Sequence, residues 1–276
     1  MATEYLDAGA KTFAASAWSG SGLAAANDFI VDVAFGPVTA GLDQSGIVGG
    51  IESFYLKPPA NGIIGGTAGS FLIDADNSAD AYVANYGQVT LYLAAGGDNT
   101  LINEFSCGPK SINFLTGGIF GELVLDGGST NVNESVEISG AVYINAGRHT
   151  IEFNGTQATV VQVNGGSLTL KRMPAQLTIN GGTVVFDPDD TETFTSTQLN
   201  MNGGRLIWKA GAIPTAYLDG GVVDFSQNRK AFTPGATAGA TSAACRIIKH
   251  PDVTLTNSVP RGASKTEVGG ATPLGG

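Results

Sequence analysis

The stretch LTINGGTVVF, residues 177–186, decides the fold of this chain. Apolar and polar residues alternate on both sides of an Asn-Gly-Gly triplet, and a period of two is typical of a β-strand with one buried face. Asn and Gly accept the positive φ angles that a sharp corner requires. The stretch therefore predicts a strand, a corner and a second strand.

The same pattern recurs along the chain with a nearly regular spacing. Each copy reads apolar, variable, apolar, Asn or Asp, Gly or Ala, Gly, and the last apolar residues lie 19, 19, 16, 22 and 17 residues apart. A period of this length is at the short end of the range that marks a solenoid. The copies are LVLDGG from Leu123, VYINAG from Val142, VQVNGG from Val161, LTINGG from Leu177, LNMNGG from Leu199 and AYLDGG from Ala216. The corner glycines that they predict are Gly127, Gly128, Gly147, Gly165, Gly166, Gly181, Gly182, Gly203, Gly204, Gly220 and Gly221.

The residues after the glycines predict a second buried face. Four copies continue with SLTL, TVVF, RLIW and VVDF, and the second and fourth residues of each are apolar. Residues two apart lie on the same face of a strand, so we expect these side chains to stack in the core. The expected core stack is Leu168, Leu170, Val184, Phe186, Leu206, Trp208, Val223 and Phe225. The intervening residues expected to point outward are Ser167, Thr169, Arg205 and Asp224.

Two architectures can use a strand–corner–strand unit. In a β-hairpin the corner reverses the chain, and Asn-Gly is a strong hairpin signal. In a parallel β-helix the corner bends the chain, which winds on so that successive copies stack, with three short strands in each rung. Similar residues at equivalent positions favour stacked copies. We therefore predict an all-β fold, a single-stranded parallel β-helix that we expect to be right-handed.

The pattern also suggests boundaries for this solenoid. The β-helix is predicted over residues 29–226, and residues 1–28 are expected to form an irregular N-terminal arm. Residues 227–276 are rich in Gly, Ala, Thr and Pro, which predicts an extended C-terminal tail with one strand-like piece at residues 252–255. We expect a neighbouring subunit or a larger assembly to hold this tail.

The composition argues against several classes of partner. The net charge is -10, whereas binding to nucleic acid needs clustered Lys and Arg, so no nucleic-acid partner is predicted. The first residues, MATEYLDAGAK, lack the features of a secretory signal, and no apolar run reaches the roughly 18 residues of a membrane helix, so no membrane partner is predicted. Cys107 and Cys245 match no metal or redox spacing, which predicts buried thiols.

The sequence predicts no catalytic residue, no cofactor and no metal ligand. His149 and His250 have no Cys, His or acidic partner at ligand spacing. The densest acidic cluster is interpreted as a solvated loop, and the alternatives are a glycosidase carboxylate pair or a calcium site. This cluster comprises Asp187, Asp189, Asp190 and Glu192.

Residues 80–226 resemble the rungs of pectin-lyase-like parallel β-helix proteins. The stretch DFIVDVAFGPVTAGLDQSGIVGGIESFYL, residues 28–56, is similar to β-helical virion proteins of tailed bacteriophages. A pectin-lyase-like enzyme would imply acidic calcium ligands and a catalytic Arg or Lys on the rungs. The candidate cations are scattered and none sits beside an acidic pair, so lyase activity is not expected. They are Arg148, Lys171, Arg172, Arg205 and Lys209.

The resemblance to virion proteins implies a non-enzymatic structural role. Such a protein would be a capsid decoration or cement protein that stabilises a phage head by bridging capsomers. It would be made in the host cytoplasm, bind the major capsid protein on the capsid exterior, and form a homotrimer. The alternative is a carbohydrate-active or glycan-binding β-helix of the tailspike or adhesin type. That alternative predicts acidic residues and exposed aromatic residues together on one outer face.

Overall fold

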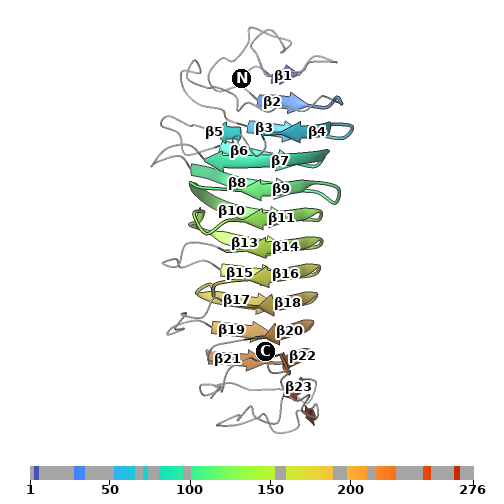
Figure 1. Cartoon of the computed structure of the whole chain (residues 1–276), viewed down its shortest axis with the longest axis vertical. Helices are drawn as coiled ribbons and strands as arrows, with labels where there is room; N and C mark the ends of the chain where they lie inside the picture. The colour runs from blue at the N-terminus through green and yellow to red at the C-terminus, as the bar shows by residue number, and fades with distance from the viewer. Residues whose placement is uncertain are drawn as a thin grey trace, which may run out of the picture. The chain divides into compact units, whose positions relative to one another are not determined.

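The computed structural model describes residues 3–5, 28–34, 53–65, 71–73, 81–95, 101–152, 160–188, 198–209, 215–227, 245–249 and 264–267. The chain divides into two compact units, unit 1 (Met1–Thr159) and unit 2 (Val160–Gly276). Each unit repeats one design, in which a strand enters a corner and the next strand leaves it (Figure 1). The strands before the corners form an entry sheet and the strands after them form an exit sheet.

In unit 1 both sheets add their main strands in chain order. The entry sheet contains β1 (Thr3–Tyr5), β2 (Asp28–Val31), β3 (Ser53–Leu56), β6 (Ala81–Asn85), β8 (Leu101–Cys107), β10 (Ile119–Leu125) and β13 (Ala141–Ile144). The exit sheet contains β4 (Asn61–Ile64), β7 (Gln88–Ala95), β9 (Ile112–Leu115), β11 (Ser129–Val132) and β14 (Arg148–Ile151). Two short strands extend them, because β12 (Glu137–Ile138) pairs with the start of β10 and β5 (Phe71–Ile73) pairs with the end of β7.

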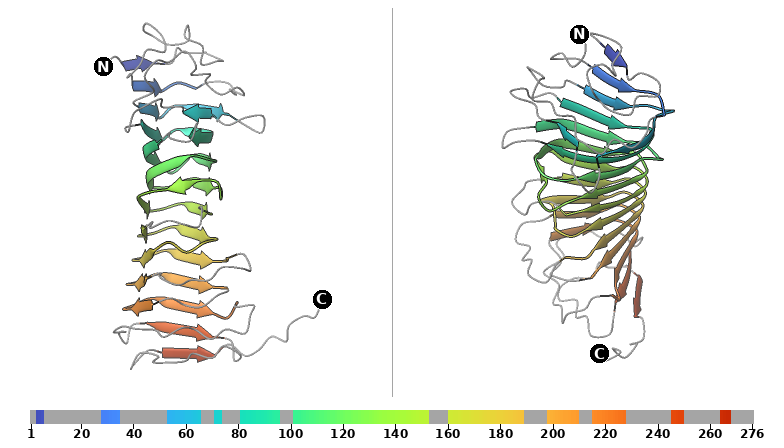
Figure 2. Two further views of the ribbon diagram at one scale, coloured as in Figure 1. Left: turned by 90° about the vertical axis from the view of Figure 1, so that its left-hand side faces the viewer. Right: turned by 45° about the horizontal axis from the view of Figure 1, so that its top comes forward.

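In unit 2 every described strand has four residues, so the repeat is more regular. The entry sheet contains β15 (Val160–Val163), β17 (Gln176–Ile179), β19 (Gln198–Met201) and β21 (Thr215–Leu218). The exit sheet contains β16 (Ser167–Leu170), β18 (Thr183–Phe186), β20 (Arg205–Trp208), β22 (Val222–Phe225), β23 (Arg246–Lys249) and β24 (Ser264–Glu267). The stacking of successive rungs within each unit can be followed in Figure 2.

The direction of strand pairing decides between the two predicted architectures. In unit 2, β17 pairs in parallel with β15 and β19, and β18 pairs in parallel with β16 and β20. A hairpin would instead have paired β17 with β18 in opposite directions. The predicted parallel β-helix is therefore confirmed. As a separate finding, no helix among the described residues is long and apolar enough to cross a membrane.

The predicted third strand of each rung is present only in part. In unit 1 the two residues of β12 pair with Ile119 and Phe120 of β10, which in turn pair with Leu101 and Ile102 of β8. In unit 2 the described third side between β16 and β17, residues 171–175, is not a strand. Its sequence KRMPA contains a proline, which cannot donate a backbone hydrogen bond to a neighbouring strand.

The corners stack on one another as closely as the strands do. Gly182 has a φ of 72°, and the amide of Thr183 donates to the Gly166 carbonyl one rung away at 2.9 Å. Gly181 leaves necessary space, because a Cβ there would lie 2.5 Å from the Asn164 carbonyl oxygen. The positive φ belongs to the last residue of each triplet, at Gly128, Gly147, Gly166, Gly182, Gly204 and Gly221. The preceding corner glycines are Gly127, Gly165, Gly181, Gly203 and Gly220.

The core of unit 2 is made of side-chain columns that follow the strand register. Leu168, Val184, Leu206 and Val223 form one column of the exit sheet, and Leu170, Phe186, Trp208 and Phe225 lie on the same inner face. All eight are at most 2% exposed. Burying a Val, Leu, Ile or Phe side chain contributes roughly 1.5–3 kcal/mol, so the columns hold the rungs together. Phe186 and Trp208 contact each other with ring centroids 4.3 Å apart.

One of the four residues expected on the outer face is buried. Ser167 and Thr169 are half-buried and Arg205 is exposed, but Asp224 is only 2% exposed. Asp224 accepts hydrogen bonds from Arg205 Nη2 at 2.5 Å and from Ser226 Oγ at 2.6 Å. Burial raises the pKa of Asp224, but the hydrogen bonds from Ser226 and Arg205 outweigh it and hold the pKa below its ordinary value. Paired in this way, the carboxylate is tolerated on a covered part of the sheet.

Described parts of the expected arm and tail belong to the sheets. In the arm, β1 pairs in parallel with β2, and in the tail, β23 pairs in parallel with β22 and β24 with β23. These strands lie on this chain's own sheets. The strand-like piece at residues 252–255 lies outside the described residues.

Candidate functional site on the entry sheet of unit 2

The described residues contain no group of three or more His, Cys, Asp or Glu that could hold a metal ion. Asp187, the first residue of the acidic cluster, forms an ion pair with Lys209 of the neighbouring rung, with Lys209 Nζ 2.9 Å from Asp187 Oδ2. The remaining acidic residues of the cluster lie outside the described residues, as does His250. They are Asp189, Asp190 and Glu192.

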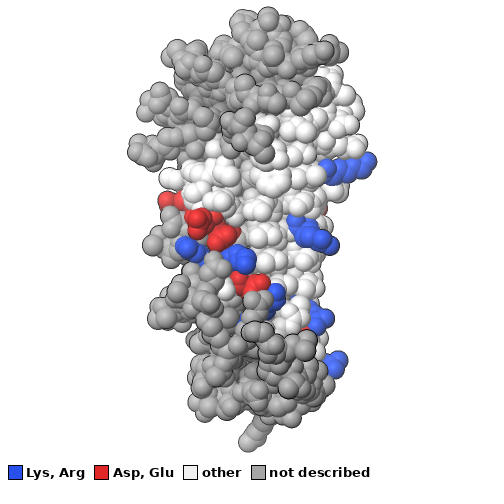
Figure 3. Space-filling model, viewed as in Figure 1, with Lys and Arg blue, Asp and Glu red and all other residues white. Residues whose placement is uncertain are grey.

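The cations that a lyase would use are not gathered at one place. Arg205 pairs with Asp224 and Lys209 with Asp187, so each serves as a bridge between neighbouring rungs. Arg148 is the first residue of β14, and Lys171 and Arg172 follow β16 directly. Figure 3 shows that most of the described surface in its view carries neither acidic nor basic side chains.

His149, the other histidine, lies in a cluster of buried polar side chains inside unit 1. This interior polar cluster comprises Asn85, Cys107, Ser111, Asn113, Thr130 and His149, each at most 1% exposed. Asn113, Thr130 and His149 occupy equivalent positions of β9, β11 and β14. Asn85 Nδ2 donates to Asn113 Oδ1 at 2.7 Å, and Asn113 Nδ2 donates to Thr130 Oγ1 at 3.3 Å. These two hydrogen bonds join side chains that are 28 and 17 residues apart in the sequence and lie on different rungs.

The surroundings of His149 and Cys107 keep both groups neutral. Nε2 of His149 donates to the Ala146 carbonyl at 2.7 Å, while Nδ1 is buried without a hydrogen-bond partner among the described residues. Burial lowers the pKa of His149 and raises the pKa of the Cys107 thiol. Cys245, in unit 2, is also a buried thiol with a pKa raised by burial. Because each side chain of the interior polar cluster is at most 1% exposed, a substrate could not reach it from solvent.

The outer face of the entry sheet in unit 2 carries a different kind of polar surface. Successive strands bring the residues of the variable position of the pattern into register, so that Thr178 pairs with Asn200 and Asn200 with Tyr217. The Asn or Asp of each pattern stands next to them at the corner. We call this surface the amide face, and it comprises Gln162, Asn164, Gln176, Thr178, Asn180, Gln198, Asn200, Asn202, Tyr217 and Asp219.

Side-chain hydrogen bonds run along the amide face from rung to rung. Asn180 Nδ2 donates to Asn164 Oδ1 at 2.9 Å, and Asn202 Nδ2 donates to Asn180 Oδ1 at 2.8 Å. In the neighbouring column Asn200 Nδ2 donates to Thr178 Oγ1 at 3.4 Å, while its Oδ1 accepts from Gln198 Nε2 at 3.0 Å. Each amide is therefore held in one orientation by its neighbours.

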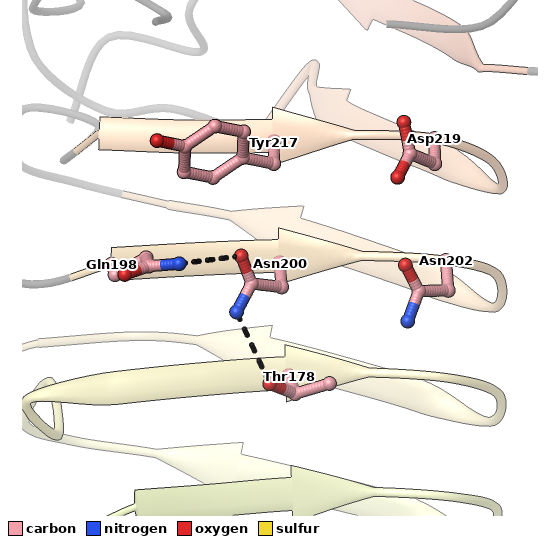
Figure 4. Close-up of a pocket in the computed structure, with 6 residues that line it drawn as sticks. All are labelled: Thr178, Gln198, Asn200, Asn202, Tyr217 and Asp219. Carbon is pink, nitrogen blue, oxygen red and sulfur yellow. Dashed lines mark hydrogen bonds between the residues drawn. The ribbon is translucent and has the colours of Figure 1, made fainter. Parts of the chain in front are cut away.

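A shallow pocket of about 380 Å³ lies on the amide face. It is lined by Thr178, Gln198, Asn200, Asn202, Tyr217 and Asp219, which come from three successive rungs (Figure 4). Tyr217, at one edge, is 39% exposed. Asp219 is the one acidic residue among the six that line the pocket. The pocket thus offers hydroxyl and amide groups, a carboxylate and an aromatic ring to a ligand.

Sequence reasoning did not predict this site. The Asn and Asp residues of the pattern were interpreted as corner formers, and the position before the last apolar residue was treated as variable. A signal was present at that position, because Gln162, Thr178, Asn200 and Tyr217 are all polar or aromatic. Two other aromatic residues that a sugar site could use are not part of this face: Trp18 lies outside the described residues, and Tyr55 lies in unit 1 with its ring centroid 5.4 Å from Lys57 Nζ.

The described strands of both units place the chain in the class of parallel β-helix proteins. No protein family, no curated protein and no solved structure matches the chain.

Proposed function

We propose that this chain is a non-enzymatic structural protein that decorates a phage capsid, where it binds the major capsid protein and reinforces the shell as a homotrimer. The observation that carries the proposal is an apolar patch on the outer face of the exit sheet in unit 1. The patch comprises Ile63, Thr90, Tyr92, Ile112 and Phe114.

The strand register makes the patch continuous across three strands. Ile63 of β4 pairs with Thr90 of β7, and Thr90 pairs with Ile112 of β9. Beside them Tyr92 and Phe114 stack with ring centroids 4.6 Å apart and ring planes 10° from parallel. Ile63 and Ile112 are exposed, and Thr90, Tyr92 and Phe114 beside them are half-buried. A largely apolar patch of this kind on a sheet is typical of a surface that binds another protein.

Covering the exposed side chains of this patch with a partner would contribute favourable free energy to binding. Ile63 is 42% exposed and Ile112 is 44% exposed. Removing apolar area from water contributes roughly 25 cal/mol per Å², before the costs of association are subtracted. A stack of hydrogen-bonded parallel rungs presents this area without a large ordering cost, which suits a protein that must resist pressure from inside a shell.

The test uses capsids assembled from the major capsid protein alone. The full chain should cosediment with them at a fixed stoichiometry and raise their thermal disruption temperature. Ile112→Asp should weaken cosedimentation about tenfold or more, because it places a charge in the contact. The matched control is Tyr82→Asp, which changes a side chain of β6 that is 41% exposed on the other sheet of the same unit.

Tyr82→Asp should bind like the unmodified chain. Failure of the unmodified chain to bind capsids would contradict the proposed function. Equal effects of the two substitutions would show that the apolar patch does not carry the contact.

A further inference from the structure

We propose that the pocket on the amide face of unit 2 binds a neutral oligosaccharide that lies along the stack of rungs. This inference does not depend on the capsid role, because the apolar patch lies on unit 1 and the pocket lies on unit 2. It rests on the hydrogen-bond donors and acceptors of the six lining residues, on the aromatic ring of Tyr217, and on the placement of these residues on successive rungs.

The polar groups of the pocket match the hydroxyl groups of a sugar. A sugar hydroxyl both donates and accepts, so it is best bound where donors and acceptors alternate at short range. An Asn or Gln side chain supplies two N–H donors and one carbonyl oxygen with two lone pairs, which leaves capacity beyond the bonds it makes within the ladder. Asn200 and Asn202 each use one N–H in a bond to the neighbouring rung.

The fixed orientation of these amides reduces the cost of binding. Asn200 is held from two sides, by Gln198 on its own strand and by Thr178 on the next rung. Asn202 is held by Asn180 at 2.8 Å. Immobilising a mobile side chain on binding costs roughly 0.5–1.5 kcal/mol of binding free energy. Side chains that are already held in place before binding avoid this loss.

Tyr217 supplies the apolar surface that sugar recognition also needs. Its ring lies along the outer face of β21, beside Gln198 and Asn200 of the next rung (Figure 4). One face of a pyranose ring presents C–H groups, which pack on an aromatic ring while the hydroxyls at the ring edge reach polar groups. A tyrosine serves this purpose well because it joins an apolar ring to a polar hydroxyl.

The charge of the pocket selects neutral ligands. Asp219 accepts hydrogen bonds only, so it favours hydroxyl donors and repels carboxylate, sulfate and phosphate groups. No Lys or Arg is among the six lining residues, and the whole chain has a net charge of -10. An acidic polysaccharide would therefore bind more weakly than a neutral one of equal length.

The repeat of the β-helix favours an oligomer over a single sugar. The lining residues come from β17, β19, β21 and the corners after β19 and β21, so equivalent positions recur at each rung. Neighbouring parallel strands lie about 4.8 Å apart, and each step presents another polar side chain. A chain of sugars along the stack would contact several rungs at once.

The test measures binding of neutral tetrasaccharides by saturation-transfer NMR and by calorimetry. The probes are cellotetraose, maltotetraose, mannotetraose and chitotetraose, with tetragalacturonate as an acidic comparison. We expect at least one neutral probe to bind the full chain and the acidic probe to bind about tenfold more weakly or not at all. Tyr217→Ala should weaken the neutral probe about tenfold or more.

The matched control is Tyr82→Ala, since Tyr82 has almost the same exposed fraction, 41%, on the entry sheet of unit 1. It should leave sugar binding unchanged. Tyr217→Phe, which keeps the ring, should bind more tightly than Tyr217→Ala. Absence of binding for all four neutral probes, or equal losses for Tyr217→Ala and Tyr82→Ala, would overturn the proposal. Neither result depends on a capsid, so the two proposals fail separately.

Discussion

Inside unit 1, polar side chains stand in register at positions that apolar side chains fill in unit 2. Thr130 and His149 occupy the same inner column as Asn113, whereas the corresponding column in unit 2 contains Leu168 and Val184. Hydrogen bonds satisfy most of these buried groups. His149 Nδ1 and Asn85 Oδ1 are the buried side-chain atoms that have no partner among the described residues. The stability of unit 1 should therefore depend on the protonation and hydrogen bonding of these side chains, which an apolar column does not require.

The neutral state of His149 predicts how stability depends on pH. Its pKa is lower in the folded chain than the value of about 6.5 that it has when unfolded, so the unfolded state binds more protons between these two values. The free energy of unfolding should therefore fall as pH is lowered through 6.5, by up to about 1.4 kcal/mol per pH unit, and level off below the folded pKa.

Chemical denaturation at a series of pH values from about 8 to about 5, roughly the range in which histidine titrates, measures this slope. His149→Gln is the test variant and His250→Gln is the control. His149→Gln should lose the histidine part of the slope, and His250→Gln should keep it. An unchanged slope in His149→Gln would contradict the assignment.

The corner glycines predict a second effect at the scale of single residues. Gly204 has a φ of 71°, and a Cβ there would lie 2.7 Å from the Gly182 carbonyl oxygen. Gly117 has a φ of 67° but nothing within 4 Å of its Cβ position. Gly117→Ala should lower the free energy of unfolding by about 1–2 kcal/mol, because alanine is strained in the left-handed backbone conformation. Gly204→Ala should lower the free energy of unfolding by more than Gly117→Ala does, because its Cβ would also push two rungs apart. Equal losses for the two variants in a denaturant titration would contradict this explanation.

At the scale of elements, the exit strands of unit 2 depend on continuous core columns. Trp208 of β20 is fully buried and contacts Phe186 of β18. Trp208→Ala should lower the free energy of unfolding by about 3–5 kcal/mol, because it removes a large side chain and leaves a cavity between rungs. Ile207→Ala, on the half-buried outer face of the same strand, should cost about 1 kcal/mol or less. Denaturant titration compares the two, and a larger loss for Ile207→Ala would place the core on the wrong face.

The same elements show what the sequence could and could not predict. The strands β15 to β22 of unit 2 were predictable because each has apolar residues two apart and a glycine corner beside it, as in Leu206, Trp208 and Gly204. The burial of Asp224 was not predictable, because the strand β23 that pairs beside it carries no copy of the pattern. The pocket was not predictable either, since it depends on which rungs bring Thr178, Asn200 and Tyr217 together.

At the scale of the whole molecule, the two units share one rung design and differ in what they expose. Unit 1 presents an apolar patch on its exit sheet, and unit 2 presents the amide face on its entry sheet. A β-helix allows this difference because inner and outer positions alternate along each strand, so the outer residues can change while the core columns are kept. Both proposed contacts depend on the same claim, that the glycine corners lead the chain onward to the next rung.

The most direct test of that claim is to measure NMR couplings through the backbone hydrogen bonds of unit 2. The parallel β-helix predicts couplings from the amide of Thr183 to the carbonyl of Gly166 and from the amide of Asn202 to the carbonyl of Ile179, which are 2.9 and 2.8 Å apart. Couplings between β17 and β18 across their shared corner would instead show antiparallel hairpins, and would contradict the fold and both proposals built on it.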